Sequence, residues 1–185
     1  SEKNRAVKDI NFQHLRFEIS DSMKMTSIKR MLLIGMIMVS SHVLKAQPEY
    51  GQAAYEVALP SVTGDTVRLS SLKGKIVLLD FWASWCGPCR ASIKKLVKLY
   101  PKYKGKGFEI LSVSIDDNLK DWKRAIEKDK ASWLEVIDKG GWYAPTPAKW
   151  RIEAIPTSFL IDKDGRVIAA DPSPKELETI LDKML

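Results

Sequence analysis

An apolar strand that runs directly into an amphipathic helix is the feature that most constrains the fold. Residues 75–82 (Lys-Ile-Val-Leu-Leu-Asp-Phe-Trp) form a nearly continuous apolar run after Gly74, which is typical of a strand covered on both faces. Over residues 93–100, apolar side chains recur at i, i+3, i+4 and i+7, while lysines occupy the opposite face. The next apolar run, Phe108–Ile115, completes a strand-helix-strand unit, which implies a right-handed parallel crossover. We therefore expect an α/β domain with a central strand at residues 75–82.

Shorter elements are expected on both sides of this unit. Ser173 and Glu176 form a capping box, and Pro174 occupies the first position of the helix that follows. Asp116 and Asn118 are candidate caps for an earlier helix. The remaining predicted elements are a hairpin of Tyr55–Leu59 and Thr66–Leu69, strands at Leu134–Ile137, Ser158–Ile161 and Arg166–Ala170, and a short helix from Thr146 to Trp150.

Composition narrows the function classes. The chain has 185 residues, of which 45% are hydrophobic and 29% charged, and this balance fits one globular domain rather than a collagen-like, disordered or multi-span membrane protein. Both histidines, His14 and His42, precede residue 47. A Cys-His protease, a Ser-His-Asp hydrolase or a His-ligated metal site needs an imidazole near the chemistry. The sequence therefore disfavours these classes unless a partner supplies the residue.

The N-terminal segment has the layout of a secretory signal. Lys24, Lys29 and Arg30 precede a nine-residue apolar stretch at 31–39, and a more polar approach leads to a cut after Ala46. A helix that crosses a bilayer needs about 20 apolar residues, so this stretch is short for a membrane anchor. We expect residues 1–46 to be an extension with a signal and residues 47–185 to be the exported, periplasmic domain. An uncleaved signal that tethers the domain to the membrane is the alternative.

Charge gives little support for nucleic-acid binding. Residues 1–46 carry 8 Lys/Arg against 4 Asp/Glu, and residues 47–185 carry 22 against 19. The high isoelectric point therefore belongs largely to the N-terminal segment. In the predicted domain, the lysines lie at helix-surface spacings beside acids. We expect no nucleic-acid partner.

The chemistry is concentrated in Cys86-Gly87-Pro88-Cys89, where two thiols lie three residues apart at the strand-to-helix junction. A helix N-terminus favours the thiolate and lowers the pKa of the first cysteine from about 8.5 toward about 7 or lower. Cys86 is therefore the expected nucleophile, and Cys89 is expected to resolve the mixed disulfide by thiol-disulfide exchange. An oxidising compartment outside the cytoplasm contains the protein disulfides with which this cysteine pair could exchange.

Three other interpretations of the cysteine pair remain open. A structural zinc site needs four ligands, and residues 47–185 have no further Cys or His beyond this pair. A peroxidase of the same fold, resembling peroxiredoxins, uses a peroxidatic cysteine in a different local pattern. A non-enzymatic binding module would use the disulfide only as a staple. We expect no metal and no cofactor other than the Cys86–Cys89 disulfide.

The segment Asp80-Phe-Trp-Ala-Ser-Trp-Cys-Gly-Pro-Cys89 resembles the active-site segment of thioredoxins. Together with the later Ile155-Pro156-Thr157, residues 52–185 resemble the exported TlpA/ResA-type oxidoreductases of the thioredoxin superfamily. The resemblance implies a three-layer sandwich with a central mixed β-sheet flanked by helices. It also implies an N-terminal hairpin and a helix-strand insertion around residues 119–137.

The resemblance assigns roles to single residues. Pro156 is expected to have a cis peptide bond, and Ile155 is expected to offer its backbone to an extended substrate. Trp85, with Gly87 and Pro88, is expected to form the surface that the substrate contacts. Asp80 matches a buried carboxyl that helps to deprotonate the second cysteine, because burial raises the pKa of an acid toward neutrality. A structural hydrogen bond for Asp80 and core packing for Trp85 are the alternatives.

The direction of electron flow is less constrained. Relatives often carry Glu and then Pro after the second cysteine, where this chain has Ser92 and Lys94. Potentials of related folds range from about −270 to about −120 mV, and the Gly-Pro dipeptide matches the reducing end of that range. We expect a monomeric oxidoreductase that reduces protein disulfides and is recharged by a membrane or periplasmic electron donor.

Two of the six tryptophans flank the loop that leads to Pro156. Trp142 and Trp150 are candidates to shape a partner groove, and plain packing is the alternative. The other four tryptophans are spread over several segments, which favours core and loop anchors over a binding stripe.

Overall fold

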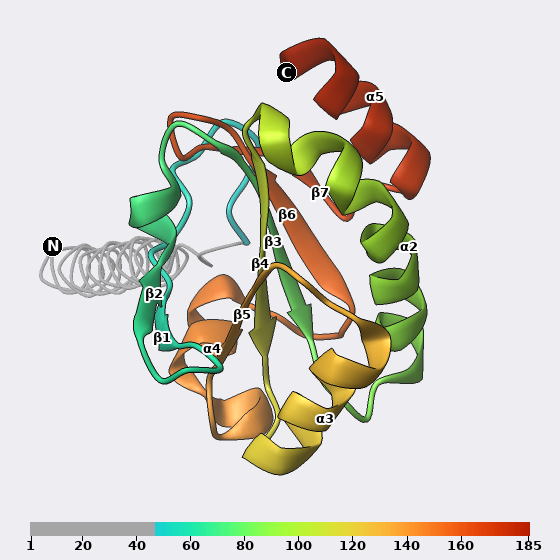
Figure 1. The fold of residues 1–185 in the computed structure, drawn as a ribbon. Helices are drawn as coiled ribbons and strands as arrows, with labels where there is room; N and C mark the ends of the chain where they lie inside the picture. The colour runs from blue at the N-terminus through green and yellow to red at the C-terminus, as the bar shows by residue number, and fades with distance from the viewer. Residues whose placement is uncertain (1–46) are drawn as a thin grey trace, which may run out of the picture. The chain divides into compact units, whose positions relative to one another are not determined.

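A five-stranded mixed sheet forms the centre of the protein, in the order β5-β4-β3-β6-β7. The structure is a computed structural model that describes residues 47–185, and Figure 1 shows its fold. The strands are β3 (Ile76–Trp82), β4 (Phe108–Ser114), β5 (Leu134–Ile137), β6 (Thr157–Ile161) and β7 (Val167–Ala170), with a separate hairpin of β1 (Ala58–Pro60) and β2 (Thr66–Arg68). The α-helices are α2 (Gly87–Tyr103), α3 (Leu119–Asp129), α4 (Pro145–Trp150) and α5 (Pro174–Met184).

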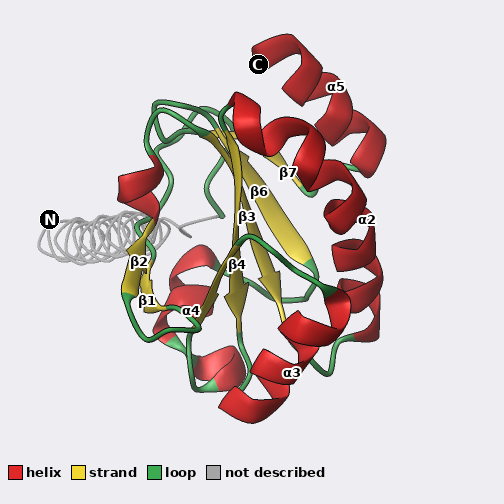
Figure 2. Cartoon of the chain, viewed as in Figure 1, coloured by secondary structure: helices red, strands yellow, loops and turns green. Residues whose placement is uncertain are grey.

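Helices cover both faces of the sheet, as the apolar run of β3 predicts (Figure 2). All seven residues of β3 are buried, and their side chains alternate between two cores. Leu78 and Trp82 face the core shared with α2, α3 and α5. Leu79 and Phe81 face the core shared with α4 and the segment around the hairpin. The predicted three-layer α/β sandwich is therefore confirmed.

Strand directions bring two distant segments to one edge of the sheet. β3 pairs parallel to β4 and antiparallel to β6, with Phe81 opposite Thr157. The carboxyl end of β3 therefore lies beside the amino end of β6. As a result, the chain leaves β3 toward Cys86 at the edge where it enters β6 from Pro156.

The predicted elements are all present, with small differences in extent. β1 begins at Ala58 rather than Tyr55, and a short 3-10 helix at Gly141–Tyr143 precedes α4. Asn118 caps α3 through its side chain, whereas Asp116 has other partners. The capping box of Ser173 and Glu176 is present at the start of α5.

The predicted signal at residues 1–46 lies outside the described residues. Within residues 47–185, no helix is both long and apolar enough to span a bilayer.

Candidate active site

Helix α2 begins on the first of the two cysteines. Cys86 has extended backbone dihedrals (φ −83°, ψ 102°) and is the N-cap residue, and its Sγ accepts a hydrogen bond from the Cys89 backbone N–H at 3.2 Å. Pro88 lies in the first turn, where its missing N–H costs nothing. Cys86 and Cys89 form a disulfide, and their Cα atoms are 5.3 Å apart. The helix N-terminus therefore places a hydrogen-bond donor and the positive end of the helix dipole at the Cys86 sulfur.

The loop before Cys86 is held from two sides through Ser84. Its backbone N–H and its hydroxyl both donate to the Asp116 carboxylate, at 2.8 and 2.6 Å. Its carbonyl oxygen accepts a hydrogen bond from Arg90 at 3.2 Å, and Arg90 also forms an ion pair with Asp129 at the end of α3. These contacts fix the loop to β4, α2 and α3, which places Cys86 at the edge of the sheet.

The loop before β6 faces the disulfide. The peptide bond between Ile155 and Pro156 is cis, as the resemblance implied. The carbonyl oxygen of Ile155 lies 3.9 Å from Cys86 Sγ. Pro156, Gly87 and Pro88 are exposed, whereas both cysteines are buried, with Cys86 at 6% and Cys89 at 1% exposure. The Ile155 carbonyl oxygen therefore faces the more exposed of the two cysteines.

Asp80 lies beneath α2 in the core. It is buried on β3, and burial raises its pKa to about 7 despite a weak hydrogen bond from the Ser112 hydroxyl at 3.4 Å. Asp80 also lines a cavity of ≈50 Å³ together with Ser92 and Lys95 of α2. This volume is enough for a water molecule, which needs about 10–15 Å³ by this measure. The cavity separates the buried carboxyl from the face of α2 that carries Ser92, and apolar residues such as Leu96 and Leu99 make up most of its lining.

A second buried acid, Glu135, was not anticipated from the sequence. It lies on β5 and accepts a hydrogen bond from the Trp82 indole N–H at 3.1 Å. Burial raises its pKa well above the usual value, and the nearby Asp80 carboxylate adds to this rise, while indole N–H groups oppose it. The sequence alone carries no signal for this burial, because glutamates are rarely buried and Glu135 stands in a strand of only four residues.

The structure separates the two tryptophans that we considered for a partner groove. Trp150 is fully buried against Phe81 and Phe159, so it belongs to the core and does not line a groove. Trp142 is exposed and packs against Trp85, with ring centroids 6.4 Å apart. Trp85 is exposed as well, so it is not core filler.

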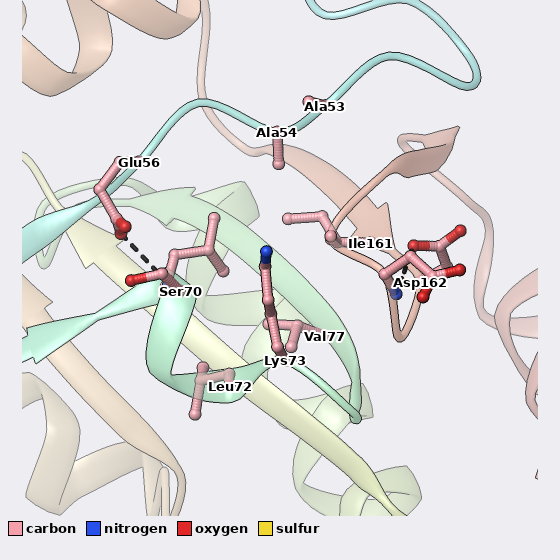
Figure 3. Close-up of a pocket in the computed structure, with 12 residues that line it drawn as sticks. Ala53, Ala54, Glu56, Ser70, Leu72, Lys73, Val77, Ile161 and Asp162 are labelled. Carbon is pink, nitrogen blue, oxygen red and sulfur yellow. Dashed lines mark hydrogen bonds between the residues drawn. The ribbon is translucent and has the colours of Figure 1, made fainter.

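Another cavity lies away from the cysteines (Figure 3). It has a volume of ≈230 Å³ and is lined in part by Val77 and Ile161, a pair at the end of β3 opposite Trp82. The Glu56 carboxylate accepts a hydrogen bond from the Ser70 N–H at its rim, drawn as a dashed line in Figure 3. In the part of the chain from residue 47 onward, no group of three or more His, Cys, Asp or Glu side chains is placed to hold a metal ion.

A disulfide at the first turn of a helix, opposite a cis-proline loop on a mixed sheet, defines a thioredoxin-fold thiol-disulfide oxidoreductase. Residues 50–170 match the AhpC/TSA family, and the chain belongs to that family. Thiol-disulfide oxidoreductase ResA of Bacillus thuringiensis is 36% identical over 139 residues, which cover 74% of this chain and 79% of the relative.

Solved structures agree with this assignment. A thiol-disulfide oxidoreductase from Bacteroides fragilis is 32% identical with a TM-score of 0.68, and the match covers 72% of this chain and 100% of that one. A thiol:disulfide interchange protein from Bacteroides sp. is 33% identical with a TM-score of 0.65, covering 74% and 90%. The chain is thus a thioredoxin-like protein-disulfide oxidoreductase, in agreement with the function expected from Cys86-Gly-Pro-Cys89.

Proposed function

We propose that this oxidoreductase acts outside the cytoplasm as a reductase of protein disulfides. The observation that carries the proposal is the position of Cys86 Sγ, between the Cys89 backbone N–H and the Ile155 carbonyl oxygen. In the reduced protein, that N–H and the helix dipole stabilise a thiolate on Cys86. Disulfide exchange requires a thiolate beside a place where an extended substrate segment can bind, and the Ile155 backbone provides that place.

The reaction has two steps. The Cys86 thiolate attacks one sulfur of the substrate disulfide, which forms a mixed disulfide and releases the other substrate sulfur as a thiol after it takes a proton. Cys89 then loses its proton and attacks Cys86 Sγ, which releases the second substrate thiol. The substrate gains two electrons and two protons, and the protein becomes the Cys86–Cys89 disulfide.

Asp80 is proposed as the proton acceptor for Cys89. Its pKa of about 7 matches what a general base needs near neutral pH. The cavity that Asp80 shares with Ser92 and Lys95 is large enough for a water molecule, and Ser92 lies one helical turn after Cys89 on α2. No cofactor other than the disulfide takes part in the proposal.

Location and partners belong to the same proposal. The pattern of residues 24–46 supports export, with residues 47–185 as the periplasmic domain, either released or tethered. We propose a monomer whose substrates are protein disulfides and whose electrons come from a membrane or periplasmic dithiol donor. The Gly87-Pro88 dipeptide supports the reducing direction.

Two measurements test the proposal. The purified chain should reduce insulin disulfides in the presence of a dithiol donor, and Cys86→Ser should lose this activity. The potential of the Cys86/Cys89 couple, equilibrated with glutathione, should lie near the thioredoxin value of about −270 mV. A potential near about −120 mV would instead assign the protein to disulfide formation.

A further inference from the structure

Two exposed indoles lie side by side next to the reactive sulfur. Trp85 is 59% exposed and Trp142 is 42% exposed, although each packs against the other. By contrast, Trp82 and Trp122 are fully buried. A tryptophan that serves only the core loses its contact with water, whereas this pair keeps apolar surface in the solvent at the position where a substrate must dock.

Consecutive acids at the end of β4 hold the two loops that carry these indoles. Asp116 accepts hydrogen bonds from Ser84, the residue before Trp85. Asp117 Oδ1 accepts a hydrogen bond from the Gly140 N–H at 3.1 Å, two residues before Trp142. Because Asp116 and Asp117 are consecutive residues just after β4, they fix the two loops at a constant spacing. The contact between the two indoles is therefore held by the fold.

The indole pair is continuous with the reaction site. Trp85 immediately precedes Cys86, whose sulfur faces the Ile155 carbonyl oxygen. A substrate segment that presents a disulfide sulfur to Cys86 therefore places the residues next to its cysteine over neighbouring surface. On the Trp85 side of Cys86, that surface includes the two indole rings, and the 96% exposed side chain of Tyr143 follows Trp142 in the chain. Trp85 also borders a cavity of ≈400 Å³ that Asp121 and Arg124 of α3 line, so the apolar part of this surface is the side where Trp85 meets Trp142.

Resting on the proposed function, we propose that Trp142 is a specificity-determining residue, which together with Trp85 selects substrates with an apolar or aromatic side chain beside the reactive cysteine. The occupant of the indole pair is that side chain. A Ser side chain has little apolar surface to place against the ring faces, whereas an apolar side chain removes its own surface and that of the rings from water. Partial burial of a Leu or Phe side chain against the two indoles should raise the rate constant about tenfold over that of a substrate with Ser at the same position.

A panel of cyclic disulfide peptides tests this proposal with the full-length chain. The peptides share a short Gly/Ser loop closed by two cysteines and differ only in the residue before the first cysteine, which is Phe, Leu, Ser or Asp. The reduced protein is mixed with each peptide, the reaction is quenched with acid, and the products are separated. We expect second-order rate constants about tenfold higher for the Phe and Leu peptides than for the Ser peptide. Trp142→Ala should reduce this ratio to about two or less.

Two variants serve as controls. Trp142→Phe keeps an aromatic ring and should retain most of the preference, which separates a contact role from a general loss of structure. Tyr50→Ala removes an aromatic side chain that is 80% exposed but lies far from Cys86. The neighbouring Gly51 N–H donates a hydrogen bond to the Val167 carbonyl, near the end of the sheet opposite Cys86. This variant should keep the full ratio of rate constants.

The outcomes separate the inference from the function on which it rests. Equal rate constants for all peptides in the wild type, or an unchanged ratio in Trp142→Ala, would overturn the selection by Trp142 while leaving the reductase in place. If the wild type reduced no peptide and behaved like Cys86→Ser, the reductase function itself would be wrong, and the selection would fall with it.

Discussion

Asp80 and Glu135 lie in one row across the sheet, each directly opposite Ser112 of the strand between them. Both carboxyls are buried, and burial raises the pKa of both. Two acids in one core cost stability whenever both are charged, because the charges repel each other and lack water. With Asp80 in its proposed role as proton acceptor, this row links the proton chemistry of the cysteines to the stability of the fold.

Asp80→Asn should stabilise the fold at neutral pH. The folded pKa of Asp80, about 7, lies above the ordinary value of 3.8, so the folded protein binds a proton that the unfolded chain has already released. The wild type therefore loses stability as the pH rises from about 4 to about 7. Over that pH range, the free energy of unfolding of the variant should rise relative to that of the wild type by up to about 4 kcal/mol. Urea unfolding at several pH values measures the difference, and a pH-independent difference would contradict the prediction.

The same substitution should slow the resolving step. When the reduced protein reacts with an aromatic disulfide such as Ellman's reagent, attack by Cys86 releases one coloured thiolate and attack by Cys89 on the mixed disulfide releases a second. In the wild type, the second phase should accelerate with a midpoint near pH 7, where Asp80 ionises. Asp80→Asn should slow that phase by about tenfold to a hundredfold at pH 7.5. An unaltered second phase would show that Asp80 is not the base.

Glu135→Gln should gain stability on the wild type as the pH rises. The pKa of Glu135 is raised in the folded protein. Its contribution to the stability of the fold is therefore present at low pH and is lost as the pH rises toward that raised pKa. The variant lacks this loss, and the difference should grow by at most about 1.4 kcal/mol per pH unit. Glu109→Gln is the matched control, because Glu109 is a buried glutamate that accepts a hydrogen bond from Tyr100 and pairs with Lys75. The control should lose stability at neutral pH.

Arg90→Met should destabilise the loop that carries Cys86. Asp129 is buried, and removal of Arg90 leaves its charge without a partner and frees the Ser84 carbonyl. The Asp129 side chain is only 3% exposed and that of Arg90 is 23% exposed, so loss of Arg90 should cost up to about 3 kcal/mol. Asp129→Asn should show a similar loss, and the double variant should lose less than the sum of the two. Strict additivity in denaturant unfolding would show that the two residues do not act together.

Cys89→Ser should trap the intermediate of the reaction. Without the resolving thiol, the mixed disulfide between Cys86 and a substrate cysteine persists, whereas Cys86→Ser forms none. Mass spectrometry under non-reducing conditions should detect the adduct only in the first variant. An adduct of equal yield in both variants would contradict the assignment of Cys86 as the nucleophile.

The sequence predicts the parts of this fold that depend on local periodicity. The apolar run at 75–82 can be buried only between two layers, and the lysine-free face at 93–100 can cover only one of them, so the sandwich follows from these two segments. The cysteine pair at the helix start likewise follows from its place between them. The position of Pro156 opposite Cys86 required the family resemblance, because nothing local relates residues 70 positions apart.

Other features depend on register, which a single sequence does not reveal. Glu135 meets the Asp80 row only because β5 pairs with β4 so that Ser112 lies opposite Glu135. A shift of one residue would turn its side chain to the other face of the sheet. Trp142 and Trp150 look alike in the sequence and lie eight residues apart, yet the first packs on Trp85 and the second on Phe159. Asp116 was a plausible helix cap, but it binds Ser84 instead.

Most helices begin on an oxygen of Ser, Thr, Asp or Asn, whereas α2 begins on the sulfur of Cys86. The proposed reactive atom is thus also the one that accepts a hydrogen bond from the Cys89 amide, in the first turn of the helix. A thiolate accepts this hydrogen bond more strongly than a disulfide sulfur does, since it carries a full negative charge. The first turn of α2 is therefore held more firmly in the reduced protein than in the oxidised protein, so the stability of this helix end depends on the oxidation state of the cysteines.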